Sequence, residues 1–296
     1  MATTIVVAGA TGNLGVRIVE ALRKRHATVR AVVRVDTASQ KIEKLDQLGV
    51  VTAKVDMHDL RDVTKACEGA SCVVSVLAGL REAIVTAQTV LLDAAVQAGV
   101  PRFIPSDFSS DFTKLPPGAN RNFDLRREFR DYLQKAPIAA TSIFNGAFAE
   151  LLLSQMRLVD LKTKRVTYWE NPDQRMNFTT MDDTAAFTAD AALDLSAPRD
   201  LHIAGDEKSA RELATLLSEI KKEPFELVRA GGLDELATMI ERLRAKDPDT
   251  TSLYPQWQGM QYMHNMFSGH AKLEPLDIAR YSDIQWTSAR EVIAAR

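Results

Sequence analysis

The first third of the chain alternates short apolar runs with segments whose apolar residues recur at helical spacing. A β-branched run at 4–8 is followed by a glycine-containing loop, after which Val16, Val19 and Leu22 recur at near-helical spacing. The same rhythm predicts further strands at 28–33, 50–55, 72–77 and 102–105, and helices at 42–48, 59–67 and 82–98. Because parallel strands need crossover connections, this alternation predicts an α/β fold with a Rossmann-type, doubly wound parallel sheet.

The pattern becomes less regular after residue 105. A loop at 113–122 contains Pro116, Pro117 and Gly118, and a helix at 123–135, a strand at 139–144 and a helix at 147–161 are expected to follow it. Beyond these, the pattern predicts strands near 165–169 and 201–203 and helices near 182–193, 209–220 and 233–244. This mixture indicates a smaller C-terminal α+β domain.

Composition narrows the class of protein. The 296 residues are 46% hydrophobic and 26% charged with a net charge of -2, which gives no electrostatic footprint for nucleic acid or an anionic membrane. No run of about 18 apolar residues occurs. Cys67 and Cys72 lack metal-ligand spacing, so no metal site is expected. We expect a reduced, cytoplasmic protein that is a monomer or a homodimer.

A glycine-rich loop joins the first expected strand to the first expected helix. Glycine permits positive φ and close approach of backbone N–H groups to a pyrophosphate, which the positive end of the helix dipole also attracts. The alternative is a turn needed only for packing, and the glycines are spaced three and three rather than as in G-x-G-x-x-G. We expect dinucleotide binding by this loop: Gly9, Thr11, Gly12, Asn13, Leu14 and Gly15.

The residues after the second and third strands bear on the choice of cofactor. Arg34 ends the second strand and Lys41 follows it, and basic side chains at this place accommodate the 2′-phosphate of NADP. Asp36 is the rival that would favour NAD, and Arg34 could also be a solvated surface residue. Asp56 and Met57 lie where an adenine ring could bind, although Asp56 could instead cap the next helix. We favour NADP(H).

Several of these motifs together resemble the NmrA-like, isoflavone-reductase-like atypical short-chain dehydrogenases, the group that includes phenylcoumaran benzylic ether and pinoresinol-lariciresinol reductases. The resemblance rests on the glycine loop, Arg34, and the segments 55–59, 102–108 and 145–148, with looser likeness at 273–275 and 281–284. It implies an NADPH-binding domain over residues 1–150, whose elements continue to about 195. Residues 151–296 would form mainly a substrate-binding domain that can interleave with the Rossmann sheet. The resemblance also adds four residues to the expected cofactor-binding set: Ala78, Ser106, Asn145 and Phe148.

The resemblance also implies a catalytic position at which this chain departs from the family. The plant reductases use a lysine as general acid or base on the helix after the Pro-Ser-acid-Phe motif, and Arg126 matches that lysine. Arginine stays protonated and is a poor proton donor, and the Tyr-x-x-x-Lys of typical short-chain dehydrogenases is also absent. Arg126 could act electrostatically on a developing oxyanion, or it could be a surface residue beside Asp124 and Glu128. Lys114 is a weaker candidate proton donor.

The segment 253–270 is the richest in aromatic residues and methionine, which suits a pocket wall for a flat substrate or, equally, ordinary core packing. The candidate substrate residues are Phe108, Trp257, Met263, His264 and Phe267. We expect an NADPH-dependent reductase that transfers a hydride to a small aromatic, enone or quinone-like molecule. The alternative is a non-catalytic, NAD(P)-binding redox sensor, as the family's namesake is.

Overall fold

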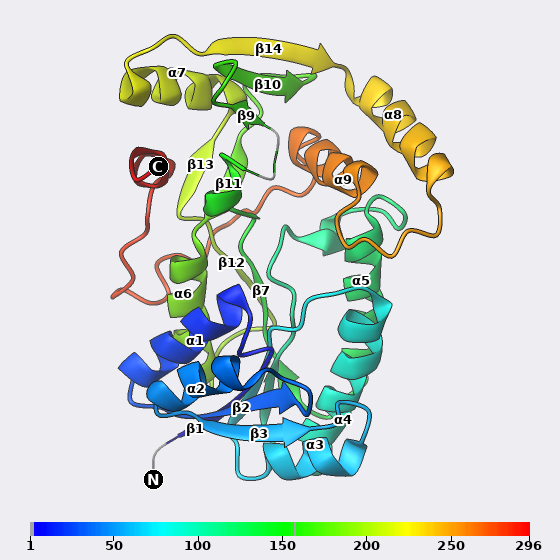
Figure 1. Ribbon diagram of the computed structural model, residues 1–296, viewed down its shortest axis with the longest axis vertical. Coiled ribbons are helices and arrows are strands. Elements are labelled where there is room, and N and C mark those ends of the chain that lie inside the picture. The colour runs from blue at the N-terminus through cyan, green and yellow to red at the C-terminus, as the bar shows by residue number, and fades with distance from the viewer. Residues whose placement is uncertain (1–2, 155, 157) are drawn as a thin grey trace.

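A six-stranded parallel sheet forms the centre of the N-terminal half (Figure 1). The structure is a computed structural model that describes residues 3–154, 156 and 158–296. Its strands are β1 (Thr4–Ala8), β2 (Thr28–Arg34), β3 (Val51–Val55), β4 (Cys72–Ser75), β5 (Arg102–Ile104) and β6 (Ala139–Ala140), in the order β3-β2-β1-β4-β5-β6. Strand β1 pairs with both β2 and β4, so the strand order reverses beside it. Ligands of such sheets bind at the carboxyl ends of the strands near this point.

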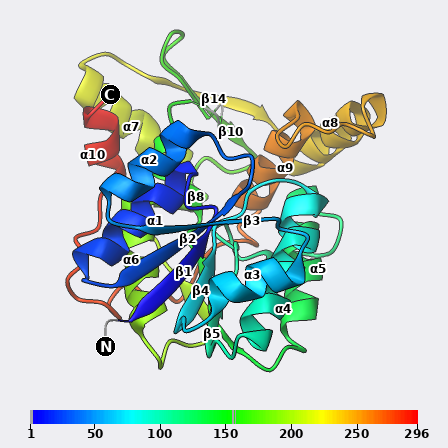
Figure 2. The ribbon, with the colours of Figure 1, turned by 60° about the horizontal axis from the view of Figure 1, so that its bottom comes forward.

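Helices cover both faces of the sheet because alternate strand residues point to opposite sides (Figure 2). Ile5 and Val7 pack in one apolar cluster with α1 (Asn13–Lys24), α2 (Ser39–Gln47) and α6 (Met181–Leu193). Val6 and Ala8 pack in another with α3 (Leu60–Cys67), α4 (Gln88–Gln97) and α5 (Arg121–Leu133). The expected doubly wound fold is therefore confirmed.

The second half of the chain builds small sheets around a third apolar cluster. One sheet has the order β14-β10-β9, from Glu226–Gly231, Arg165–Trp169 and Val159–Asp160, and another the order β13-β11-β8, from Asp206–Lys208, Met176–Thr179 and Ala147–Phe148. The helices here are α7 (Ala210–Lys221), α8 (Leu233–Lys246), α9 (Gln256–Phe267) and α10 (Ala289–Ala294). No helix among the described residues is long and apolar enough to cross a membrane.

The chain passes between the two halves more than once. Strand β12 (Asp200–His202) pairs with β7 (Ser142–Phe144), which continues directly from β6 of the main sheet. Helix α6 packs against α1, the first helix of the chain. Elements beyond residue 151 therefore contact both the main sheet and the smaller ones.

The expected helix at 147–161 is wrong. Among the described residues this segment forms β8, a short 3-10 turn at Ala149–Leu151, and β9; residues 155 and 157 lie outside the description. Gly146 has a φ of +67°, and a Cβ there would lie 2.4 Å from the Asn177 carbonyl oxygen. The close approach to β11 turns the chain, and pairing of β8 with β11 then overrides the helical spacing of the apolar residues.

Two further boundaries differ from the expectation. The strand expected at 139–144 is divided between β6, which pairs with β5, and β7, which pairs with β12. The helix expected at 82–98 begins with a π-helical segment, Glu82–Ala87, before α4.

Candidate cofactor and substrate site

The glycine loop is a tight turn at the carboxyl end of β1. Gly12 N–H donates to the Gly9 carbonyl at 3.0 Å. Gly9 has a φ of +82°, and a Cβ there would lie 2.5 Å from the Val76 carbonyl oxygen, so only glycine fits. A Cβ on Gly15 would lie 2.2 Å from the Gly9 oxygen. Gly9 and Gly15 therefore fix the turn itself.

Gly12 differs from its two neighbours in the motif. Its φ is -80°, and the nearest atom to a Cβ there, the Gly9 oxygen, is 3.3 Å away. A side chain at Gly12 would therefore need the Gly9 oxygen to move by a few tenths of an ångström, which is a smaller conflict than at Gly9 or Gly15, and Gly12 is exposed. No side chain caps α1 at its N-terminus and no acidic residue stands in its first turn. An uncapped, acid-free helix start suits the pyrophosphate of a dinucleotide.

The remaining residues of the loop lie around this opening. Thr11 and Leu14 are half-buried and Asn13 is exposed. The Asn13 side chain accepts a hydrogen bond from Arg17 one turn further on. All the loop residues that the motif singled out thus gather at the start of α1.

Arg34 ends β2, beside the strand that carries the glycine loop. Its side chain is 73% exposed, and its Nε lies 3.3 Å from the Asp36 carboxylate, which is equally exposed. Lys41 is exposed on α2. Arg34 is thus available to an incoming phosphate, although Asp36 competes for its charge.

The expected cofactor residues after β3 and β4 differ in their exposure. Asp56 is exposed and accepts a hydrogen bond from the His58 N–H, whereas the cap of α3 is Asp59. Met57 is buried in the core beneath the sheet edge. Ala78 is exposed just beyond the end of β4, near the reversal of strand order.

Asn145 is a buried polar residue at the carboxyl end of β7. The residue follows β7 and is fully buried, yet neither its Oδ1 nor its Nδ2 has a hydrogen-bond partner among the described residues. Buried amides are normally paired, so both atoms call for a partner that the chain does not supply. Phe148, three residues later on β8, is half-buried against the core. An amide without a described partner, three residues before an aromatic side chain, makes Asn145 and Phe148 candidates for the nicotinamide end of the cofactor.

Arg126 lies inward on α5. Its Nε donates to the Ser106 carbonyl at 3.0 Å and its Nη1 to the Asn122 carbonyl at 3.1 Å. The two acidic neighbours that could have held it at the surface are engaged elsewhere: Asp124 accepts from the Gly118 N–H, and Glu128 pairs with Arg81. Arg126 is therefore held at the loop that follows β5.

The Ser106–Asp107 segment beneath Arg126 is itself tightly bonded. Ser106 Oγ donates to the Leu77 carbonyl at 2.7 Å, which ties the loop after β5 to the loop after β4. Burial raises the pKa of Asp107, which accepts a hydrogen bond from Ser142 Oγ at 2.8 Å. The positive charge of Arg126 acts in the opposite direction on that pKa.

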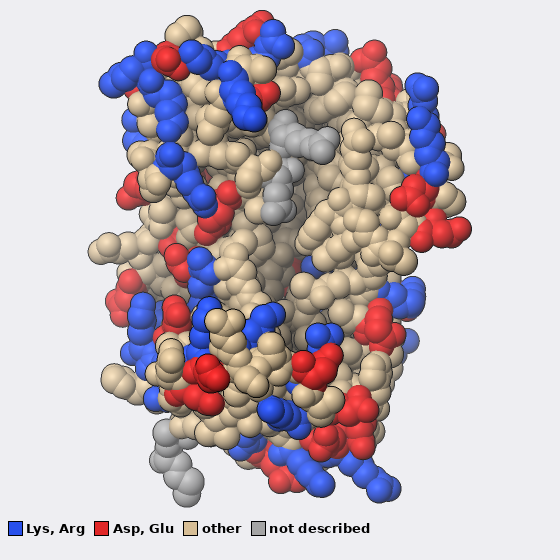
Figure 3. Space-filling view, viewed as in Figure 1, with Lys and Arg blue, Asp and Glu red and all other residues tan. Residues whose placement is uncertain are grey.

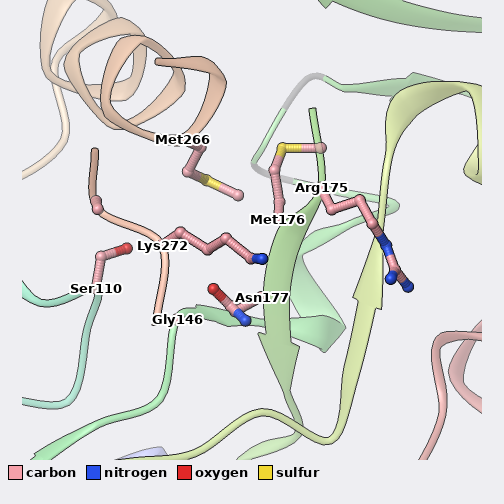
Figure 4. Close-up of a pocket in the computed structure, with 8 residues that line it drawn as sticks. Ser110, Gly146, Arg175, Met176, Asn177, Met266 and Lys272 are labelled. Atoms are coloured by element: carbon pink, nitrogen blue, oxygen red, sulfur yellow. The ribbon is translucent and has the colours of Figure 1, made fainter. Parts of the chain in front are cut away.

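A small pocket opens beyond this loop. Figure 3 shows a groove down this face whose walls are mostly neither acidic nor basic. In Figure 4 the side chain of Lys272 extends across the pocket toward Asn177, with Met176 and Met266 nearby, whereas Arg175 points away. The lining residues are Ser110, Gly146, Arg175, Met176, Asn177, Met266, Ala271 and Lys272.

Lysine side chains near the pocket are already engaged. Lys114 Nζ donates to the Lys272 carbonyl at 2.9 Å, so it holds the C-terminal segment to the loop. Lys272 Nζ lies 2.9 Å from the Glu274 carboxylate, and this hydrogen bond raises the pKa of Lys272. Lys114 is therefore the weaker of the two catalytic candidates named from the sequence.

A buried acid–imidazole pair anchors the loop that carries Ser110. His202 Nε2 lies 3.0 Å from the Asp111 carboxylate, and the imidazole stacks on Phe144. Burial acts to raise the pKa of Asp111, but hydrogen bonds from His202 and Thr113 outweigh it and leave the pKa lowered. The pair holds this side of the pocket to β12.

The expected substrate residues are mostly packed in the core. Phe108, Met263 and Phe267 are buried in apolar clusters, and Trp257 lies under the guanidinium groups of Arg121 and Arg244. His264 is half-buried, and burial lowers its pKa. These five residues support α9 and the sheet edge, whereas the pocket wall itself is formed by their neighbour Met266.

Sequence reasoning missed most of the lining. Lys272, Asn177 and Met176 come from segments for which no strand or site was expected. The looser resemblance at 273–275 lies directly beside Lys272 and was the one available signal.

The chain is similar to known proteins over most of its length. The sequence model of the NmrA-like family matches residues 1–287. Pinoresinol reductase 2 of Arabidopsis thaliana is 31% identical over 215 residues, which cover 68% of this chain and 67% of that protein. The solved structure of AtPrR2 with NADP⁺ and (+)pinoresinol has a TM-score of 0.85 at 21% identity, covering 100% of this chain and 99% of that one. An NADPH-dependent quinone oxidoreductase from Escherichia coli has a TM-score of 0.78 at 18% identity over 98% of both chains.

Proposed function

The chain belongs to the NmrA-like family, as its motifs predicted, and we propose that it is an NADPH-dependent reductase of a small aromatic, enone or quinone-like acceptor. The position of Arg126 carries this proposal. Its guanidinium is bonded to the loop after β5, and the same loop reaches the pocket at Ser110. A fixed positive charge is thus bonded to the loop that also lines the pocket.

In this proposal, different residues at the sheet edge hold different parts of the cofactor. The glycine loop and the start of α1 would hold the pyrophosphate, Arg34 and Lys41 the 2′-phosphate, and Asn145 with Phe148 the nicotinamide end. NADPH, when bound, supplies the hydride. Two of the structures with similar folds are named for complexes or activities with this cofactor.

The acceptor follows from what the side chains near the pocket can do. Met176 and Met266 provide adaptable apolar contacts, and several relatives are named for aromatic substrates. Arg126 keeps its proton, so it can stabilise negative charge on an acceptor oxygen but is a poor proton donor. We therefore infer an acceptor that delocalises the charge left by hydride addition, as a quinone or an activated enone does.

The second candidate function is redox sensing without turnover, and the arginine in place of the family lysine favours it. The test is oxidation of NADPH, followed by its absorbance, with a panel of quinones and phenolic enones. Turnover that the Gly12→Val variant abolishes would support the reductase. Binding of NADPH with no turnover on any member of the panel would favour the sensor.

A further inference from the structure

The hydroxyl of Tyr262 is bonded to the start of α5. Its Oη accepts a hydrogen bond from Asn122 Nδ2 at 3.2 Å, and its ring packs edge-on against Phe123 with centroids 5.2 Å apart. Asn122 also accepts, through its carbonyl, the hydrogen bond from Arg126 Nη1. The hydroxyl of Tyr262 and the guanidinium of Arg126 are therefore held by the same residue.

Both groups retain donors that the chain does not use. The Tyr262 hydroxyl accepts from Asn122, but its own hydrogen has no acceptor among the described residues. The Nη2 of Arg126 likewise donates to no residue in the described part of the chain. By contrast, Arg121 is engaged with the carbonyls of Ser252 and Leu253.

The two groups also influence each other electrostatically. Burial raises the pKa of Tyr262, and the positive charge of Arg126 is the strongest influence in the opposite direction. The charges of Arg121 and Tyr254 act on the same hydroxyl more weakly. A raised pKa keeps the hydroxyl protonated at neutral pH, so it remains a hydrogen-bond donor.

The position of the pair matches the end of the site at which an acceptor would react. Arg126 is bonded to Ser106, whose hydroxyl joins the carboxyl ends of β4 and β5. Met266, one helical turn after Tyr262 on α9, lines the pocket. Tyr262 thus lies on the helix that also supplies Met266 to the pocket wall.

We propose that Tyr262 is a catalytic residue that, together with Arg126, donates hydrogen bonds to the acceptor oxygen on which negative charge develops. This rests on the proposed reductase function. The hydride adds to the acceptor carbon, its electron pair displaces the π electrons onto the oxygen, and the resulting oxyanion takes its proton from water after transfer. No proton needs to leave either Tyr262 or Arg126.

The kinetic test compares Tyr262→Phe with Tyr132→Phe. Tyr132 lies on α5 and also has a bonded hydroxyl, which donates to Asp93 at 2.9 Å, so its variant controls for the loss of a hydrogen-bonded hydroxyl. Loss of one oxyanion donor lowers kcat by about 100-fold or more. We expect that loss in the Tyr262 variant with NADPH affinity retained, and an unchanged kcat in the control. Equal kcat in all three proteins would overturn the proposal while leaving the reductase function intact.

A second measurement does not depend on turnover. The absorbance of 4-nitrophenol reports whether the bound molecule is a phenol or a phenolate, and titration of the NADP⁺-loaded protein gives its pKa in the site. We expect the bound probe to ionise at lower pH than the free probe, and this shift to shrink in both Tyr262→Phe and Arg126→Gln. The proposed role of Tyr262 and Arg126 would be overturned if the probe does not bind, or if both variants preserve the pKa shift. This outcome can be read even if the variants fold poorly or the protein proves to be a sensor.

Discussion

Replacing Arg34 with alanine should remove most of a preference for NADPH over NADH. Arg34 is the basic side chain at the end of β2, the place at which a 2′-phosphate would distinguish the two cofactors. NADH lacks that phosphate, so its affinity should not change. The prediction therefore concerns the ratio of two dissociation constants measured on the same protein.

The surroundings of Arg34 set the size of the effect. A charge-assisted hydrogen bond contributes about 1.5 to 3 kcal/mol. The side chain is 73% exposed and gives up its 3.3 Å contact with Asp36 on binding, and an exposed pair of this kind is worth at most about 1 kcal/mol. The difference, about 0.5 to 2 kcal/mol, corresponds to a loss of about 2- to 30-fold in NADPH affinity.

Fluorescence titration of NADPH and NADH against the parent protein and its variants measures this ratio. Lys44→Ala removes an exposed basic residue from α2 without touching the proposed contact, and should leave both affinities unchanged. Asp36→Ala removes the rival carboxylate and should not weaken NADPH binding. Equal affinities for the two cofactors in the parent protein, or an Arg34 variant that weakens both alike, would refute the reasoning.

Three further predictions address the loop, the buried pair and the catalytic position. Gly12→Val should abolish NADPH binding in a protein that still folds, because its φ of -80° suits a side chain, whereas Gly15→Val should lower the melting temperature, because a Cβ there meets the Gly9 oxygen at 2.2 Å. Asp111→Asn should cost about 1.5 to 3 kcal/mol of stability at neutral pH. Since the folded pKa of Asp111 is lowered, its stabilisation is present above about pH 4 and is lost as the pH falls through that folded pKa. The free energies of unfolding of the variant and the parent, measured at several pH values, should therefore converge in acid. Glu82→Gln, which removes the exposed contact with His58, serves as the control and should change the free energy of unfolding little. Arg126→Lys should retain NADPH oxidation and add a basic-limb pKa on a non-quinone substrate; identical pH profiles on every substrate would argue against this placement.

The N-terminal half could be predicted because its signals are local. Strands β1 and β4 are apolar runs of a few residues, and α1 shows a clear helical periodicity, so these signals do not depend on distant partners. Glycine is required at Gly9 because the Val76 carbonyl, just after β4, leaves no room for a Cβ. The residue could nevertheless be identified from the glycine motif. The place of Arg34 at the end of β2 follows from the same local pattern.

In the C-terminal half the sequence predicted β10, β12 and the helices α6, α7 and α8, but not the strands that are defined mainly by their partners. Strand β13 consists of Asp206, Glu207 and Lys208, which carry no apolar signal, and it exists through pairing with β11. The pocket combines β11 with Ala271 and Lys272, which are remote in sequence. Arg126 was placed by its match to a family position, whereas its bond to Ser106 needed the folded chain.

The replacement of lysine by arginine is best understood from what surrounds the position. Neither lysine near the pocket restores a titrating donor: Lys114 is bonded to a backbone carbonyl, and the Glu274 carboxylate raises the pKa of Lys272. Burial raises the pKa of Asp107, but the side chain of Asp107 is bonded to Ser142 and not to a group in the pocket. The fixed charge of Arg126 is thus retained while easy proton donation beside it is not. We propose that such a site favours acceptors whose reduced form is stable as an anion until it meets water, and selects against those that need a proton during hydride transfer.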